Sequence, residues 1–175
     1  MFITDAAGTT QIATMPKRTN PLGLVQLNNE HTATFKAITK DVGYRKITSE
    51  GYMTLTVERV ERRKVFGHDA LDYSLCHYGE LNGDLMRDPE MLFLVVEDET
   101  GWHVYPHYYR NDYAFGIERQ SIVPTESGLA VNKAEQRHQT EFASMWMGNL
   151  VGQGFVANAA KQPLIKTLKQ LEEEG

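Results

Sequence analysis

Residues 91–109 read MLFLVVEDETGWHVYPHYY, and this stretch decides the fold. Residues 91–96 are apolar at successive positions, as in a central strand that is covered on both faces. The polar turn 97–101 ends in glycine, and residues 102–109 then pair back across it as a hairpin. A parallel crossover needs a dozen or more residues, so this short connection predicts antiparallel strands.

Further strand patterns flank this hairpin on both sides. Upstream, apolar and polar residues alternate from Tyr52 to Glu58 and again over residues 71–78. Downstream, Tyr113, Phe115 and Ile117 alternate with other residues in the same way. The connections are short and hold no helix that is long enough for a crossover. The sequence therefore predicts an antiparallel meander of about five strands.

Helical patterns lie before and after the meander. Asn28 or Asn29 is placed to cap a short helix that ends near residues 41–43. Phe35 and Ile38 lie on the buried face of this helix. A longer helix begins near Asn132 and carries one stripe, which consists of Phe142, Met145, Trp146, Asn149 and Leu150. A short tail helix follows, with leucines at Leu164, Leu168 and Leu171. A meander followed by helices predicts an α+β fold with C-terminal helices packed on one face of the sheet.

The length of 175 residues favours one domain with a substantial core. Residues 1–21 are rich in Thr, Gly, Ala and Pro, so we expect a flexible N-terminal arm before a single domain of residues 22–175. The alternative is that the arm docks as an edge strand through Ile12 and Met15.

Charge and composition restrict the compartment and the class of partner. The net charge of −5 argues against a general nucleic-acid binder, whose surface would be basic. Cys76 is the only cysteine, so an intramolecular disulfide and a cysteine-based zinc site are excluded. We expect no signal peptide, and the longest apolar runs of about six residues are too short for a membrane span. We therefore expect a cytoplasmic protein without a membrane partner.

The richest chemistry lies in residues 77–91, HYGELNGDLMRDPEM. Asn82 and Gly83 favour a tight turn because both residues tolerate positive φ. Residues 84–87 could form one helical turn, and Asp88 before Pro89 is a turn former. These features predict a rigid connection between two strands without any further function.

A metal site is the alternative for the same stretch. Asp84, Asp88 and Glu90 lie close together in sequence, and His77 ends the preceding strand. Carboxylates at this density can hold Mg²⁺ or Ca²⁺, although the spacing is not that of an EF-hand. A zinc site of His77, His103 and His107 is a further possibility, but residues four apart in a strand lie about 13 Å from each other.

Aromatic residues concentrate in the next hairpin, at Trp102, Tyr105, Tyr108, Tyr109 and Tyr113, with Arg110 and Arg119 nearby. We expect sheet packing first, because tyrosine and tryptophan are favoured in strands. A surface for a protein partner is the second interpretation, and base stacking by a single-strand binder is the third. The sequence contains no phosphate-binding glycine loop, zinc-protease motif or nucleophile elbow, so it predicts no catalytic residue and no cofactor.

The stretch CHYGELNGDLMRDPEMLFLV resembles the signature of a family of small proteins from phages, plasmids and other mobile elements, a domain of unknown function. The pattern is His-Tyr, three residues, Asn-Gly-Asp-Leu-Met, one variable residue and Asp-Pro-Glu. It falls here on residues 77–78, 82–86 and 88–90. Looser resemblance continues in WHVYPHYYRNDYAFGIERQ and FASMWMGNLVGQGF, so that about residues 70–155 are covered.

The resemblance implies a mobile-element origin and an intracellular setting. It implies no particular biochemical activity. The leading hypothesis is an accessory protein that binds a host protein or nucleoprotein, for example as an anti-CRISPR-type inhibitor of host defence. The alternatives are a metal-dependent enzyme with a site at residues 77–90 and a single-stranded nucleic-acid-binding module. The candidate binding residues are His77, Tyr78, Asn82, Asp84, Asp88, Glu90, Trp102, Tyr105, Tyr109 and Arg110.

Overall fold

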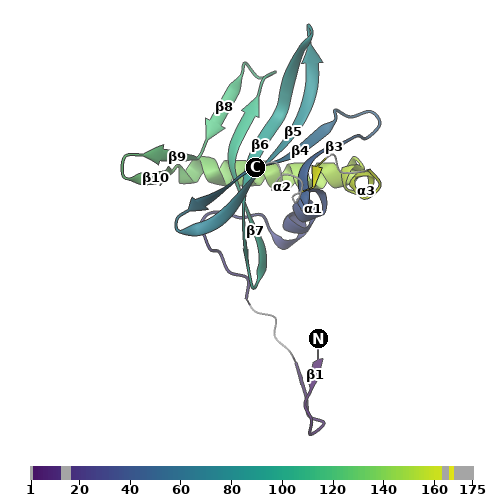
Figure 1. Cartoon of the computed structure of the whole chain (residues 1–175), viewed down its shortest axis with the longest axis vertical. Coiled ribbons are helices and arrows are strands. Elements are labelled where there is room, and N and C mark those ends of the chain that lie inside the picture. Colours follow the sequence, from purple (N-terminus) through teal and green to yellow (C-terminus); the bar gives the residue numbers. More distant parts are fainter. Residues whose placement is uncertain (1, 13–16, 163–165, 168–175) are drawn as a thin grey trace.

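The computed structural model describes residues 2–12, 17–162 and 166–167. Its main sheet has the order β11-β3-β4-β5-β6-β7-β8, and all neighbouring strands are antiparallel (Figure 1). The strands are β3 (Val42–Ile47), β4 (Leu55–Val65), β5 (His68–Leu81), β6 (Asp84–Asp98), β7 (Gly101–Asn111), β8 (Ile117–Gln120) and β11 (Lys166–Thr167). Strands β3 to β8 follow one another in the chain, so the predicted antiparallel meander is confirmed.

Three local predictions about strands were wrong. Strand β3 was missed because Arg45 and Lys46 interrupt its apolar pattern, and the Arg45 side chain is nevertheless buried. Residues 84–89 form neither a helical turn nor a chain reversal, since they all belong to β6. Phe115 lies in a loop with a φ of 58° and is fully exposed, and β8 begins only at Ile117.

Two tight turns explain why the long strands fold back on their neighbours. Phe66 and Gly67 connect β4 to β5 with φ values of 47° and 79°. Asn82 and Gly83 connect β5 to β6 with φ values of 53° and 85°, as predicted for this pair. Two successive residues with positive φ match the right-handed twist of a β-hairpin.

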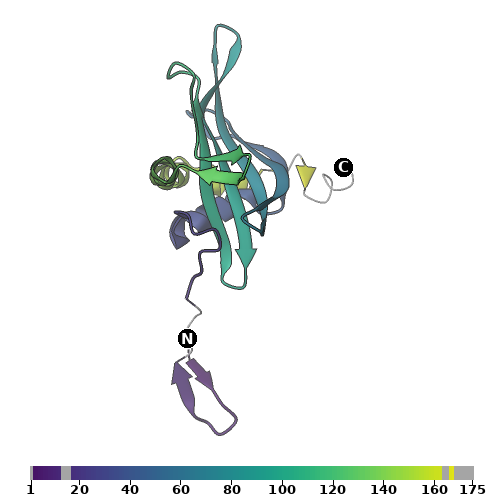
Figure 2. The ribbon, with the colours of Figure 1, turned by 90° about the vertical axis from the view of Figure 1, so that its left-hand side faces the viewer.

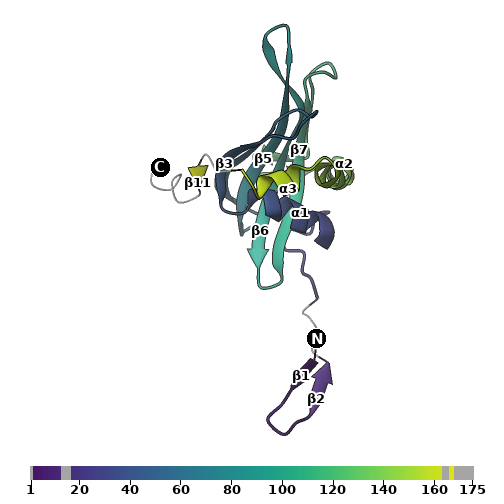
Figure 3. The same ribbon diagram turned by 90° about the vertical axis from the view of Figure 1, so that its right-hand side faces the viewer.

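Helices α1 (Asn29–Thr39), α2 (Lys133–Gly152) and α3 (Phe155–Ala159) cover one face of the sheet, which we call the helix face (Figures 2 and 3). The Asn28 side chain caps α1 by accepting from His31 N at 2.8 Å, as expected. The main core lies between these helices and β3–β7, and it includes Phe35, Ile38, Tyr73, Leu75, Met91, Phe93, Val95, Trp146, Met147, Leu150 and Phe155.

The predicted stripe of α2 is only partly right. Trp146 and Leu150 face the core, whereas Met145 is 55% exposed and Asn149 is exposed as well. The helix buries Gln136, Gln139 and Thr140 in its first half, so polar side chains form part of its inner face. The predicted tail-helix leucines lie outside the described residues.

A second core lies on the opposite face of the sheet. It contains Leu22, Leu24, Val65, Ala70, Leu94, Val96, Tyr105 and Ile122. The small hairpin of β9 (Ile122–Thr125) and β10 (Gly128–Val131) covers part of this face. Residues 91–96 therefore lie between two cores, and the predicted central strand is confirmed.

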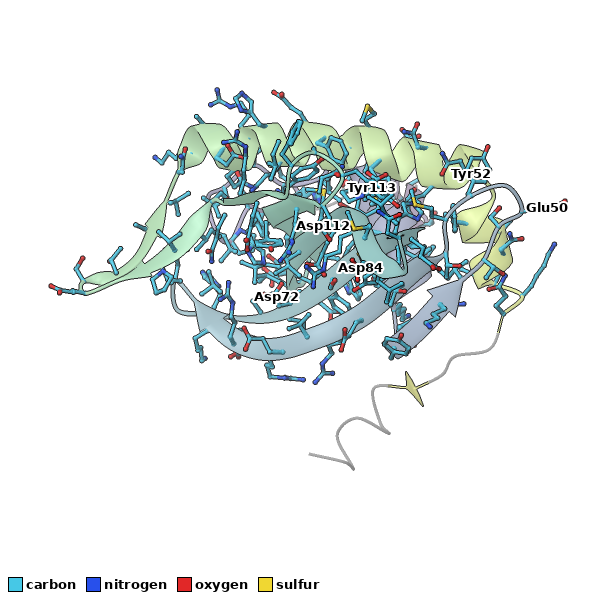
Figure 4. The ribbon with its side chains drawn as sticks, turned by 90° about the horizontal axis from the view of Figure 1, so that it is seen from above. Glu50, Tyr52, Asp72, Asp84, Asp112 and Tyr113 are labelled. Carbon is cyan, nitrogen blue, oxygen red and sulfur yellow. The ribbon has the colours of Figure 1, made fainter. Side chains whose placement is uncertain are left out.

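The sheet curls around this second face, which we call the concave face. Val65 of β4 and Ile122 of β9 belong to one cluster there, although four strands separate them along the chain. Figure 4 shows the curled sheet from above: α2 lies along its outer side, and Asp72 lies on the inner side of the curve.

Strands β1 (Phe2–Thr4) and β2 (Thr10–Ile12) form a two-stranded sheet of their own. Met15, through which edge-strand docking was considered, lies outside the described residues. Arg18 Nη1 donates to the Leu27 carbonyl at 2.9 Å, so residue 18 of the expected arm is bonded to the body of the domain. The boundary at residue 21 stays a prediction.

Candidate functional site

A cavity of about 700 Å³ lies on the concave face of the sheet. Five successive strands, β3 to β7, or the residues next to them, supply its lining. These lining residues are Tyr44, Lys46, Thr54, Thr56, Glu58, Tyr78, Leu85, Arg87, Arg110 and Asp112. Lys46, Glu58 and Leu85 are exposed, so the cavity is open to solvent.

The strand register arranges polar side chains in a row beside this cavity. Cys76 lies opposite Thr56 on one side and Glu90 on the other, and Glu90 lies opposite Arg110. Directly opposed residues in a sheet share a face. Residues from four different strands thus meet on the concave face, although they are up to 54 positions apart in sequence (110 − 56).

A β-bulge places Arg87 on the same face. The β5–β6 register shifts between Cys76 and Tyr78, so that Tyr78 lies opposite Arg87. Bulges re-aim side chains in this way. As a result, Arg87 and Glu90 lie on one face, with 3.8 Å between Arg87 Nε and Glu90 Oε1. Pro89 lies within the bulged segment, and proline inside a strand is a sign of a bulge.

The two arginines of the cavity differ in how their donors are used. Arg110 Nε donates to Asp112 Oδ1 at 2.9 Å, and the backbone N–H of Arg87 donates to Asp112 Oδ2 at 2.9 Å. These two bonds, the backbone one foremost, hold the pKa of Asp112 below its usual range. Arg87 Nε is buried and has no hydrogen-bond acceptor within the described residues. A bound group with acceptor oxygens would satisfy it.

The Cys76 thiol in this row is unreactive at neutral pH. Burial, together with the charge of Glu90, raises the pKa of Cys76 to about 12. Since the thiolate is the reactive form of cysteine, Cys76 is not an activated nucleophile at neutral pH. The mixed charges and tyrosines that line the cavity are suited to binding a polar partner.

A family model described as a domain of unknown function (DUF6908) matches residues 24–156. The chain belongs to this family. The match includes α1, α2 and all strands of the meander from β3 to β8, so the family domain contains the whole cavity. It begins well before residue 70, where the resemblance in the sequence began. No curated protein and no solved structure matches the chain.

Within the family domain, the structure brings only some of the predicted site residues together. Tyr78 and Arg110 line the cavity, and Glu90 borders it through its contact with Arg87. Lys46, Glu58 and Arg87 also belong to it, and sequence reasoning missed them. Lys46 and Tyr44 were missed because β3 was not recognised, whereas Arg87 was missed because Pro89 was interpreted as part of a turn and not as a bulge in a strand.

The other residues of the predicted acidic cluster lie apart. His77 is on the helix face, between the rings of Trp146 and Phe155 at centroid distances of 5.5 and 5.2 Å. Asp88 Oδ1 accepts from Asn111 Nδ2 at 2.7 Å, and Asp84 is exposed beside the Asn82 turn. In the part of the chain that the structure describes, no three His, Cys, Asp or Glu residues are grouped as metal ligands.

The histidines of the considered zinc site are likewise separated. His103 Nε2 lies 2.9 Å from Asp98 Oδ1, and His107 Nε2 lies 2.9 Å from Asp72 Oδ1. Both residues are buried, and each bonds a different carboxylate, while His77 lies on the helix face.

The aromatic residues considered for base stacking serve as packing groups. Tyr105 is fully buried, and its hydroxyl donates to Asn20 Oδ1 at 2.6 Å. Trp102 packs near Phe35 at 6.4 Å between centroids, and Tyr109 packs against Phe142 at 5.1 Å. Trp102 and Tyr109 belong to the main core and Tyr105 to the second core, so the three do not form one stacking surface.

Among residues 2–12, 17–162 and 166–167, no helix is both long enough and apolar enough to cross a membrane.

Proposed function

We propose that this chain is an accessory protein of a phage or another mobile element and that it binds a host protein through its concave face. Inhibition of a host defence nucleoprotein is the form of this proposal to test first. The resemblance of residues 77–90 to a mobile-element signature supports the origin. The open cavity on the concave face is the observation that carries the binding role.

The composition of the cavity supports a macromolecular partner. Tyrosine and arginine are the residue types that contribute most at protein interfaces, and the cavity contains two of each. Leu85 lines it and is 72% exposed. An exposed apolar side chain beside open charged groups is typical of an interface that becomes buried upon binding.

Exposed apolar side chains extend beyond the cavity along one end of the molecule. Leu81 is 47% exposed, Tyr113 43% and Phe115 completely. Tyr113 lies close to Gly79, where a Cβ atom would come within 2.5 Å of the Tyr113 hydroxyl. This close approach, together with the bond from the Tyr113 hydroxyl to the Glu80 carbonyl, holds the β7–β8 loop against the β5–β6 hairpin.

Affinity capture from host lysate tests the proposal with matched variants. Tagged wild-type protein and Arg137→Ala, which changes an exposed arginine of α2, should capture the same partner in stoichiometric amount. Tyr78→Ala and the double variant Arg87→Ala/Arg110→Ala should lose it while keeping a wild-type circular dichroism spectrum.

Capture of nothing by the wild type would overturn the proposal. So would a partner that folded cavity variants retain as well as the wild type, because its binding would then not use the concave face.

A further inference from the structure

Strand β8 is an outer strand of the sheet, and among the residues that the structure describes it pairs with β7 alone. All four of its residues are exposed. Figure 1 shows β8 at the free side of the sheet, above the β9–β10 hairpin. An edge strand of this kind presents unpaired backbone groups that can template a further strand.

The hydrogen bonds identify which groups of β8 point outward. Ser121 N donates to the His107 carbonyl at 3.0 Å, so the N–H of Ser121 points toward β7, while its carbonyl accepts from Asn132 N at 2.8 Å. Backbone direction alternates along a strand, and Glu118 and Gln120 therefore direct their N–H and C=O groups away from β7. Within the described residues no hydrogen bond is found for these two N–H groups.

A groove of about 560 Å³ runs between β8 and α2, beside this edge. Tyr109, Ile117 and Phe142 supply its apolar surface. Ile117 is 39% exposed, and Phe142 is only partly buried. A free strand edge beside an apolar groove is the arrangement that domains use when an extended peptide adds a strand: the edge supplies backbone bonds and the groove takes alternate side chains.

Charge argues against a second copy of this chain as the added strand. Outward-pointing residues must face outward-pointing residues, so a two-fold antiparallel pairing centres on Glu118, on Arg119 or on Gln120. The first two arrangements oppose like charges directly, which is destabilising. In a pairing centred on Gln120, only the C-terminal ends of the two β8 strands lie beside each other. A peptide of a different sequence avoids these conflicts.

We propose that β8 accepts an extended peptide of a protein partner as an additional strand. The peptide places apolar side chains in the groove at Ile117 and Phe142. It places a basic side chain beside Glu118, because directly opposed residues share a face and Glu118 is exposed on its outer side. On its inner side Glu118 lies opposite Arg110 and accepts from the Tyr108 hydroxyl at 2.7 Å. Apolar and basic residues thus alternate along the peptide. This surface is separate from the cavity, and neither proposal depends on the other.

The probe is a fluorescently labelled eight-residue peptide of alternating valine and lysine, and its binding is measured by anisotropy. The decisive variant is Gln120→Pro, which removes an outward N–H but no bond to β7. Residue 119 before the proline already has the extended backbone that proline favours. The matched control is Gln120→Thr, which keeps the N–H.

The wild type and Gln120→Thr should bind the peptide with similar Kd, and Gln120→Pro should bind about tenfold or more weakly. The same peptide with alternate backbone nitrogens methylated should lose affinity as well. Circular dichroism and the Tm verify that Gln120→Pro is folded.

Equal binding by folded Gln120→Pro would overturn the proposal, as would undiminished binding of the methylated peptide, since attraction between side chains would then explain the affinity. Sedimentation of the protein without peptide measures whether a second copy of the chain occupies this edge. A dimer that Gln120→Pro abolishes would show that a second copy uses this edge.

Discussion

His77 is a buried imidazole between two aromatic rings of the helix layer. Its Nδ1 lies 3.0 Å from the Met53 carbonyl oxygen. Burial lowers the pKa of His77 from its ordinary value, because the charged imidazolium is poorly solvated there. The charge of Asp88 opposes this shift without reversing it. His77 is therefore a neutral core residue, even though the sequence presents it as the start of a charged motif.

This pKa shift predicts how stability depends on pH. The unfolded chain takes up a proton at His77 as the pH falls below about 6.5, whereas the folded chain resists it. The free energy of unfolding should therefore decrease through this window, and His77→Phe should remove that part of the decrease. Urea denaturation at pH 7.5 and 5.5 measures it, and the wild type should lose up to about 1 kcal/mol more than His77→Phe.

The carboxylates titrate in both proteins and cancel in this comparison. Equal losses in the wild type and in His77→Phe would show that the His77 imidazole is solvated in the folded state.

At the scale of the elements, the β5–β6 hairpin depends on its two-residue turn. A Cβ atom added at Gly83 would meet nothing within 4 Å, so only its φ of 85° restricts the residue there. An L side chain in this region of φ and ψ costs about 1–2 kcal/mol.

Gly83→Ala should accordingly lower the free energy of unfolding by about 1–2 kcal/mol. Asn82→Gly, at a φ of 53°, should change it by less than about 0.5 kcal/mol, because glycine tolerates that conformation and the site is exposed. Urea denaturation of the two variants provides the comparison. A neutral Gly83→Ala would mean that the turn adopts negative φ in solution.

Helix α2 shows how an element depends on what it packs against. Trp146 is 4% exposed and Met145 55%, although both belong to the apolar stripe that the sequence predicts. The inner face of α2 also contains Gln136, whose Nε2 donates to the Val25 and Pro106 carbonyls. Polar residues on the inner face shift the buried stripe away from the one that apolar residues alone define.

For the whole molecule, the docking of α2 on the sheet makes Trp146 and Met145 unequal. Trp146→Ala should lower the free energy of unfolding by about 3–5 kcal/mol, because it leaves a cavity in the main core. Met145→Ala should stay within about 0.5 kcal/mol of the wild type. Chemical denaturation of both variants tests this, and a larger loss for Met145→Ala would require a rotated helix.

The strands illustrate what sequence patterns can and cannot predict about the whole sheet. The turn at Asn82 and Gly83, the cap at Asn28 and the buried run 91–96 were predicted because each depends on neighbouring residues or on a short period. Of the candidate binding residues, Tyr78 and Arg110 line the cavity and Glu90 borders it. Lys46 depends on the unrecognised β3 and Arg87 on the bulge in β5–β6, whereas Glu58 lies in the predicted strand β4 but was not recognised as a site residue.

By itself, then, the sequence determined the antiparallel order, the position of the hairpins and the presence of helices after the meander. Short connections leave few other ways to join such strands. Only the tertiary structure decided which polar residues meet beside β6, because the run 91–96 is buried on both faces and its pattern has no polar side. The bulge and the curl of the sheet settled that choice. The bulge puts Arg87 into the cavity, since a shift of one residue in register exchanges the two faces of a strand. His77 reaches the core by the regular alternation that it shares with Tyr73 and Leu75.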